Sequence, residues 1–220
     1  VKIKVLIDNI AKRIIVIVLV VIVLLGLCLW SSGIFSKNSD ASKFYSEYGE
    51  NSNITEKNLY VYASKEEILD LLDHKTGVIY FGFPTCPWCQ SMVSVLNNTA
   101  HANKYKQIYY YNIKNDRDEL SLNAQGEIIT DKNSTALYRE LVDEMEEFLS
   151  PYTLTDSEGK KVDTGTKRIY VPLVVFVKDG KVMYVHEATV KSQEDPKVEL
   201  TDKQITELAS IYQKGFDLLK

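Results

Sequence analysis

Two cysteines three residues apart, Cys86 and Cys89, are the residues of this chain best suited to chemistry. They follow an apolar run at residues 78–81 and precede a helical pattern of apolar residues that begins at Met92. On a helix, side chains at this spacing have Cβ atoms about 5–6 Å apart, close enough for a disulfide after a small adjustment. Cys86 would stand at the helix N-terminus, where the helix dipole and free N–H groups stabilise a thiolate. We therefore expect Cys86 to be the nucleophile and Cys89 to be the thiol that displaces a mixed disulfide.

Three other roles compete for this pair. A zinc site normally needs four ligands, but the chain has no second cysteine pair, and His74, His101 and His186 lack the spacing of metal ligands. We therefore expect no metal and no other cofactor. A purely structural disulfide is an alternative, although so short a loop would restrict the unfolded chain little. A domain that binds partners without redox turnover is the remaining alternative.

Residues 14–30 are a run of 17 residues without a charged side chain. A helix of this length, rising about 1.5 Å per residue, spans roughly 25 Å, the short end of what a bilayer crossing needs. Lys12 and Arg13 precede the run and Trp30 ends it. This arrangement predicts a transmembrane anchor, with residues 1–13 in the cytoplasm and the rest of the chain outside. A cleaved signal peptide is the alternative, but its apolar region is usually only about 7–15 residues. We expect Cys28, inside the run, to be inert.

The formal charge of −4 is divided unevenly along the chain. Residues 1–30 carry four basic residues against Asp8, a net of +3, so residues 31–220 carry −7. Nucleic-acid binding needs a basic surface, and this acidic body therefore argues against a nucleic-acid partner. Residues 31–57 are rich in Ser, Asn, Lys and Glu and have no sustained apolar period. They predict a flexible tether that holds a soluble domain, residues 58–220, away from the membrane.

The soluble part alternates between strand and helix patterns. Apolar or aromatic runs predict strands over residues 59–62, 78–81, 108–113, 171–177 and 181–190. Helical spacing of apolar residues predicts helices over residues 65–74, from the cysteine pair to about 98, and from Thr201 or Asp202 onward. Ser64 and Glu67 form a capping box before the first of these helices. Tyrosines 109–111 are expected to pack their rings in a strand and to keep their hydroxyls in water.

This order of elements resembles the thioredoxin-like superfamily. The resemblance is carried by a Cys-x-x-Cys pair between a strand and a helix, and by Val171-Pro172 at the start of a later strand. It covers residues 58–220 apart from an insertion, and it implies an α/β fold in which helices flank a central mixed sheet. More narrowly, Phe-Pro-Thr-Cys-Pro-Trp-Cys at residues 83–89, with Tyr109-Tyr110 and Val171-Pro172, is similar to bacteriocin-accessory thioredoxin-like proteins of Gram-positive bacteria.

The resemblance implies roles for several residues around the pair. Pro172 would be a cis-proline that faces an active-site disulfide between Cys86 and Cys89. The residues that would contact substrate are Val171, Pro172, Pro87 and Trp88.

Two departures from the family pattern stand out. Thioredoxins carry a buried acid six residues before the first cysteine, where this chain has Tyr80. A phenol with a pKa of about 10 is a poor proton acceptor at neutral pH, so we expect water or another acid to deprotonate Cys89. The connection before Pro172 is also long, and it predicts a helical insertion at about residues 119–168. Within it, residues 135–149 predict an amphipathic helix, and residues 151–168 predict a loop or small hairpin near the site.

These features predict a membrane-anchored, extracytoplasmic thiol–disulfide oxidoreductase. Its partners would be protein or peptide thiols and disulfides, together with a redox partner in the membrane or envelope. The alternative is a non-catalytic accessory module that binds a secreted peptide or a transporter while its cysteines rest as a stable disulfide.

Overall fold

A computed structural model of the chain describes residues 14–23 and 34–220. The chain divides into two units, residues 1–40 and 41–220. In the first unit, residues 14–23 are helical and their apolar side chains are exposed. Across both described ranges, no helix is long and apolar enough to cross a bilayer. Residues 24–30 of the expected anchor, the expected cytoplasmic segment 1–13, and residues 31–33 of the expected tether lie outside the described residues.

The second unit is built on a five-stranded sheet of strand order β1-β3-β2-β8-β9. Strands β1, β3 and β2 run parallel, whereas β8 pairs antiparallel with both β2 and β9. The sheet is therefore mixed, as predicted. The strands are β1 (Tyr60–Tyr62), β2 (Gly77–Gly82), β3 (Ile108–Asn112), β8 (Leu173–Lys178) and β9 (Lys181–Glu187).

Helices cover both faces of this sheet, because alternate residues of the buried strand β2 point to opposite sides. Val78 and Tyr80 pack in one core with helices α2, α4 and α6, whereas Ile79 and Phe81 pack in the other with α3 and α5. This arrangement confirms the predicted α/β class. The helix bounds are α2 (Ile34–Tyr48), α3 (Lys65–His74), α4 (Pro87–Ala102), α5 (Ala136–Glu144) and α6 (Asp202–Leu218).

The prediction of a flexible tether up to residue 57 is wrong for its described part. Helix α2 is followed by a short 3-10 helix, η1 (Gly49–Asn51), and the domain begins at residue 41. Phe44 and Tyr48 lie one turn apart on α2 and are completely buried. Phe44 stacks on Tyr48 with ring centroids 4.3 Å apart, and on Tyr60 of β1 at 3.9 Å. Two buried aromatic rings hold this segment on the domain although its sequence is otherwise polar.

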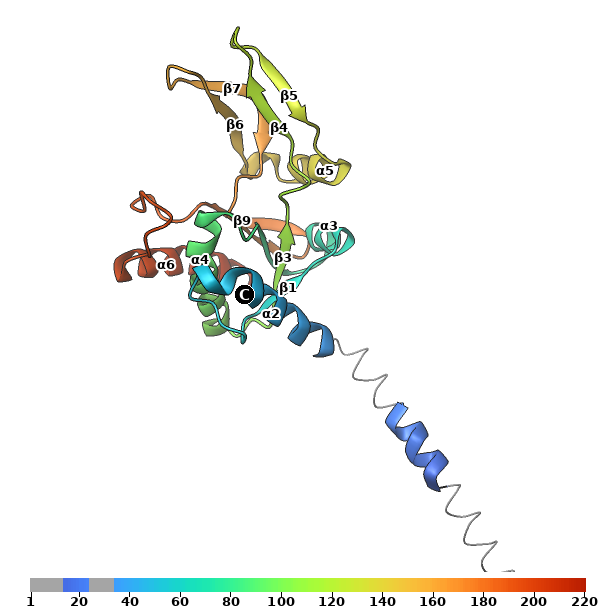
Figure 1. Cartoon of the computed structure of the whole chain (residues 1–220). Coiled ribbons are helices and arrows are strands. Elements are labelled where there is room, and N and C mark those ends of the chain that lie inside the picture. The colour runs from blue at the N-terminus through green and yellow to red at the C-terminus, as the bar shows by residue number, and fades with distance from the viewer. Residues whose placement is uncertain (1–13, 24–33) are drawn as a thin grey trace, which may run out of the picture. The chain divides into compact units, whose positions relative to one another are not determined.

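The sequence predicted a helical insertion, and this prediction is wrong. The insertion consists of two hairpins around a helix that is shorter than expected. Figure 1 shows the hairpins side by side, with α5 between them and the five-stranded sheet. Gly126 and Gly159, both with positive φ, occupy the two turns. The expected helix over 135–149 ends at Glu144, and a 3-10 turn follows it. The remaining elements are β4 (Glu119–Leu122), β5 (Ile128–Lys132), η2 (Glu146–Phe148), β6 (Ser150–Thr155) and β7 (Lys161–Arg168).

Candidate functional site

The two cysteines lie at the start of α4, at the carboxyl end of β2. Cys86 is the N-cap of the helix, and Pro87 takes the first helical position, which needs no N–H donor. Cys86 keeps 7% of its surface exposed, whereas Cys89, one turn into the helix, keeps none. Both are free thiols, the reduced form of the pair. Cys86 is therefore the more accessible of the two, and Cys89 is completely covered.

The two thiols have opposite electrostatic environments. A hydrogen bond from the Cys89 thiol, backbone N–H groups of Cys89 and Trp88, and the charge of Arg117 together lower the Cys86 pKa to about 7, against the effect of burial. Burial raises the pKa of Cys89 well above that of a free thiol, and the hydrogen bond and charge of Cys86 raise it further. At neutral pH a large fraction of Cys86 is thus the thiolate, and Cys89 keeps its proton. This division suits a nucleophile and a resolving thiol.

The segment before β8 lies against the Cys86 sulfur. The Val171–Pro172 peptide bond is cis, as expected, and the Val171 carbonyl oxygen lies 3.9 Å from the Cys86 sulfur. Pro172 is buried, while Val171, Pro87 and Trp88 stay partly exposed. The structure therefore brings Val171 and Pro172 to the cysteine pair, from a strand far away in the sequence.

Three tyrosines, Tyr48, Tyr80 and Tyr110, pack in the same core as Cys89. The side chain of Tyr80 acts to lower the Cys89 pKa, against the effect of burial. The Tyr80 hydroxyl lies 3.2 Å from the Tyr48 hydroxyl, which donates to the Tyr110 hydroxyl at 3.3 Å. All three tyrosines are completely buried. The expectation that the hydroxyls of the tyrosine triplet stay in water is therefore wrong for Tyr110.

Arg117 is a residue of this site that the sequence analysis missed. It lies in the connection from β3 to β4, and its guanidinium is 5.0 Å from the ring centroid of Phe83. Lys114 approaches the same ring at 5.6 Å and donates to the Thr85 hydroxyl at 3.3 Å. Two cations thus border the segment that leads into Cys86. Burial and the charge of Arg168 lower the Arg117 pKa, but an arginine stays protonated at physiological pH. No local pattern in the sequence singles out this residue.

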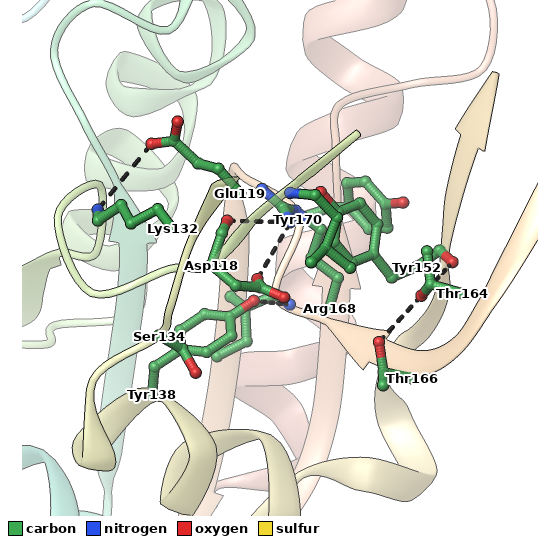
Figure 2. A network of polar contacts seen from close by, with 12 residues as sticks. Asp118, Glu119, Lys132, Ser134, Tyr138, Tyr152, Thr164, Thr166, Arg168 and Tyr170 are labelled. Carbon is green, nitrogen blue, oxygen red and sulfur yellow. Dashed lines mark hydrogen bonds and ion pairs between the residues drawn. The ribbon is translucent and has the colours of Figure 1, made fainter. Parts of the chain in front are cut away.

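A second arginine joins the two ends of the insertion, as Figure 2 shows. Arg168 donates to the Asp118 carboxylate at 3.2 Å, and its guanidinium lies 3.9 Å from the ring centroid of Tyr152. The Tyr138 hydroxyl of α5 accepts from the Ile169 backbone N–H at 3.1 Å. These contacts hold the residues next to Arg117 and the residues that lead to Val171. The insertion therefore positions both borders of the cysteine site.

No other described group competes with this site as a centre of chemistry. Across residues 14–23 and 34–220, no cluster of His, Cys, Asp and Glu could hold a metal ion. His186, one of the three histidines, has its ring Nε2 2.9 Å from the Thr189 carbonyl oxygen. A cavity of about 440 Å³ lies between residues 49–53, one side of α4 and residues 196–200, and neither cysteine lines it.

A scan against models of protein families finds no match to the chain, and neither does a search of curated proteins.

Proposed function

We propose that this chain is a thiol–disulfide oxidoreductase with a thioredoxin-like fold. The observation that carries the proposal is the asymmetry of the pair. Cys86 keeps 7% of its surface exposed, lies at a helix N-terminus and has a pKa lowered to about 7, while Cys89 lies one turn into the helix as a fully buried thiol. A purely structural disulfide would need neither the lowered pKa nor the single exposed sulfur.

In the reducing direction, the Cys86 thiolate attacks a disulfide of the client protein or peptide. A bond forms between Cys86 and one client sulfur, and the other client sulfur leaves as a thiolate. Cys89 then loses its proton and attacks the Cys86 sulfur. The Cys86–Cys89 disulfide forms, the second client sulfur leaves as a thiolate, and two electrons have passed to the client. Oxidation of a client runs through the same steps in reverse.

The client would bind along the surface made by Val171, Pro172, Pro87 and Trp88. Residues before β8 offer backbone groups next to Cys86, and the Val171 carbonyl oxygen lies 3.9 Å from the Cys86 sulfur. A bound peptide cysteine would then be held with its sulfur in reach of Cys86. Such positioning is a main source of rate in exchange reactions.

The proposal extends to the location of the protein. The uncharged run 14–30, preceded by Lys12 and Arg13, supports a single-pass membrane anchor with the N-terminus in the cytoplasm. The domain at residues 41–220 would then work outside the cytoplasm, where a redox partner in the membrane or envelope resets the pair. Accessibility of Cys86 to a membrane-impermeant maleimide in intact cells tests this arrangement, and labelling only after lysis would contradict it.

A trapping experiment tests the activity. Cys89→Ser removes the resolving thiol, so we expect this variant to accumulate mixed disulfides with client proteins through Cys86. The double variant Cys86→Ser/Cys89→Ser is the matched control and should trap nothing. If Cys86→Ser alone kept full disulfide-exchange activity, the proposal would be wrong.

A non-catalytic accessory module is the second candidate. One observation favours it: the β4–β5 hairpin exposes the apolar side chains of Ile128 and Ile129, at 41% and 42%. Exposed apolar side chains on a hairpin edge suit the docking of a peptide. The reduction potential of the pair separates the two functions. A value below about −300 mV indicates a structural bond, and a higher value indicates exchange.

A further inference from the structure

Two positively charged side chains, Arg117 and Lys114, contact the residues that lead into Cys86. The Arg117 guanidinium lies 5.0 Å from the ring centroid of Phe83, whose carbonyl oxygen accepts a hydrogen bond from the Cys86 N–H at 3.1 Å. Lys114 donates to the hydroxyl of Thr85, the residue just before Cys86, at 3.3 Å. Neither cation forms an ion pair with a carboxylate of the described residues. Two uncompensated positive charges therefore lie beside the proposed nucleophile.

The fold leaves the hydrogen-bond donors of Arg117 unused. Its Nε atom is buried and has no hydrogen-bond partner in the part of the chain that the structure describes. The side chain as a whole is partly exposed, so an acceptor from outside can reach the guanidinium. A buried donor without a partner is unfavourable, above all on a charged group. Arg117 is thus a group that a negatively charged ligand would complete.

The acidic residues on either side of Arg117 are already engaged elsewhere. The Asp116 carboxylate accepts a hydrogen bond from the hydroxyl of Thr135, the N-cap of α5, at 2.9 Å. The Asp118 carboxylate accepts from Arg168 at 3.2 Å. These contacts fix the backbone before and after Arg117 and leave it without an internal counterion. The insertion therefore holds a charged donor in place in advance, which lowers the cost of ordering it when a ligand binds.

The positive charge at this site contrasts with the rest of the soluble chain. Residues 31–220 carry a net charge of −7. An acidic ligand is repelled by most of such a surface and attracted only where cations gather. Charge complementarity thus favours an acidic partner at the cysteine site in particular.

We propose that Arg117 and Lys114 select clients whose reactive cysteine is flanked by aspartate or glutamate. The inference rests on the proposed exchange function and names the class of its clients. The client carboxylate would accept hydrogen bonds from the guanidinium, whose planar fork matches a carboxylate. Lys114, at the surface, would add a second attraction. The exchange step itself is unchanged: the bond from Cys86 to the client sulfur forms as the client disulfide breaks.

A different role for Arg117 predicts a different result. Its charge also helps to lower the Cys86 pKa, and that effect alone would speed the reaction with every client by the same factor. Selection of acidic clients instead changes the ratio of the rates between clients. A comparison of clients that differ only in charge therefore separates the two roles.

Three model clients supply this comparison. Each is an acetylated and amidated peptide with one cysteine as a pyridyl disulfide, flanked on both sides by Glu, by Gln or by Lys. Attack by Cys86 on the peptide sulfur releases pyridinethione, a neutral chromophore. Division by the rate with mercaptoethanol removes the intrinsic reactivity of each peptide. We expect the reduced protein to prefer the Glu peptide over the Gln peptide by about three- to tenfold, the scale of one or two partly screened ion pairs, and to react slowest with the Lys peptide.

Four variants assign the preference to the two cations. Arg117→Gln should lose most of it, whereas Arg117→Lys keeps the charge and should retain at least half. Lys114→Gln should reduce the preference by about twofold. Lys161→Gln is the matched control, because it removes the same charge at the turn end of the β6–β7 hairpin. Its preference should equal that of the wild type.

Equal normalised rates of the wild type with all three peptides would overturn the proposal. It is also wrong if Arg117→Gln slows all three by one common factor, because Arg117 would then act through the thiolate alone. A wild type that reacts with no peptide faster than mercaptoethanol does would instead overturn the exchange function. Thermal unfolding checks that each variant folds. If Arg117→Gln does not fold, Lys114→Glu at an exposed position provides the test, and it must lower the preference for Glu over Lys at least about threefold.

Discussion

Arg168 and Asp118 form an ion pair at 3.2 Å that joins the last strand of the insertion to the residues before its first strand. Their side chains keep 11% and 21% of their surface exposed, so water screens the pair only in part. Arg168 also donates to the Asp118 backbone carbonyl at 3.4 Å. This one contact closes the insertion at its base, next to the cysteine site.

Removal of this carboxylate should destabilise the domain. In Asp118→Ala, the Arg168 charge would stay largely buried without its partner, which typically costs about 3–5 kcal/mol for a fully buried pair. Because both groups here keep some exposure, we expect about 1–3 kcal/mol. Urea unfolding measures the difference. Glu119→Ala, which removes an exposed carboxylate 4.0 Å from Lys132, is the control and should change stability by less than about 1 kcal/mol.

The charge of Arg117 should set part of the reactivity of Cys86. Its positive charge lowers the Cys86 pKa, so Arg117→Gln is expected to move that pKa upward from about 7. Below that pH, the rate of alkylation by iodoacetamide should fall about two- to fivefold, as for the loss of a partly screened ion pair. Lys114→Gln removes a cation from the same Phe83 ring. An equal effect of both variants would mean that general surface charge, rather than Arg117, acts on the thiolate.

The reduced protein should gain stability as the pH rises through neutrality. The folded pKa of Cys86 is lowered to about 7, whereas a thiol in an unfolded chain titrates near pH 8.5. The stabilisation is therefore fully present above about pH 8.5 and is lost as the pH falls through about 7. Relative to Cys86→Ser, we expect about 2 kcal/mol more stability at about pH 9 than at about pH 6. Parallel stability curves for the two proteins would contradict the lowered pKa.

Helix α2 should be an essential part of the folded domain. Phe44→Ala would leave a cavity among stacked rings, and such substitutions cost about 3–5 kcal/mol. Tyr45→Ala is the control on the same helix, because this ring is 38% exposed and its loss should cost much less. Thermal unfolding of both variants measures how much stability each substitution costs. If Phe44→Ala were as mild as Tyr45→Ala, the original expectation of a loose tether would regain support.

The elements with local signals could be predicted from the sequence. Ser64 caps α3 with a full capping box, and Thr201 does the same for α6. The helix behind the cysteines was predictable because an apolar strand run, Pro87 at the first helical position and apolar spacing all agree there. Each of these signals lies within a few residues of the feature it predicts.

The missed features depend on packing between distant segments. Arg117 has no periodic neighbours, and only the closed base of the insertion brings it to Cys86. Helix α2 carries few apolar residues, so the partners of Phe44 and Tyr48 on β1 and β3 could not be foreseen. Tyr80 was judged alone as a poor proton acceptor. Tyr48 and Tyr110, whose hydroxyls join the same buried network, come from elsewhere in the chain.

The unequal exposure of the two sulfurs also bears on oxidative damage. A diffusing peroxide meets Cys86 and not Cys89, because only Cys86 reaches the surface. The product is a sulfenic acid, which would otherwise proceed to irreversible acids. Cys89 lies directly beneath it and can condense with it to a disulfide, releasing water. We expect mass spectrometry after peroxide treatment to find the loss of two hydrogens rather than added oxygen, so the buried sulfur protects its partner from permanent loss.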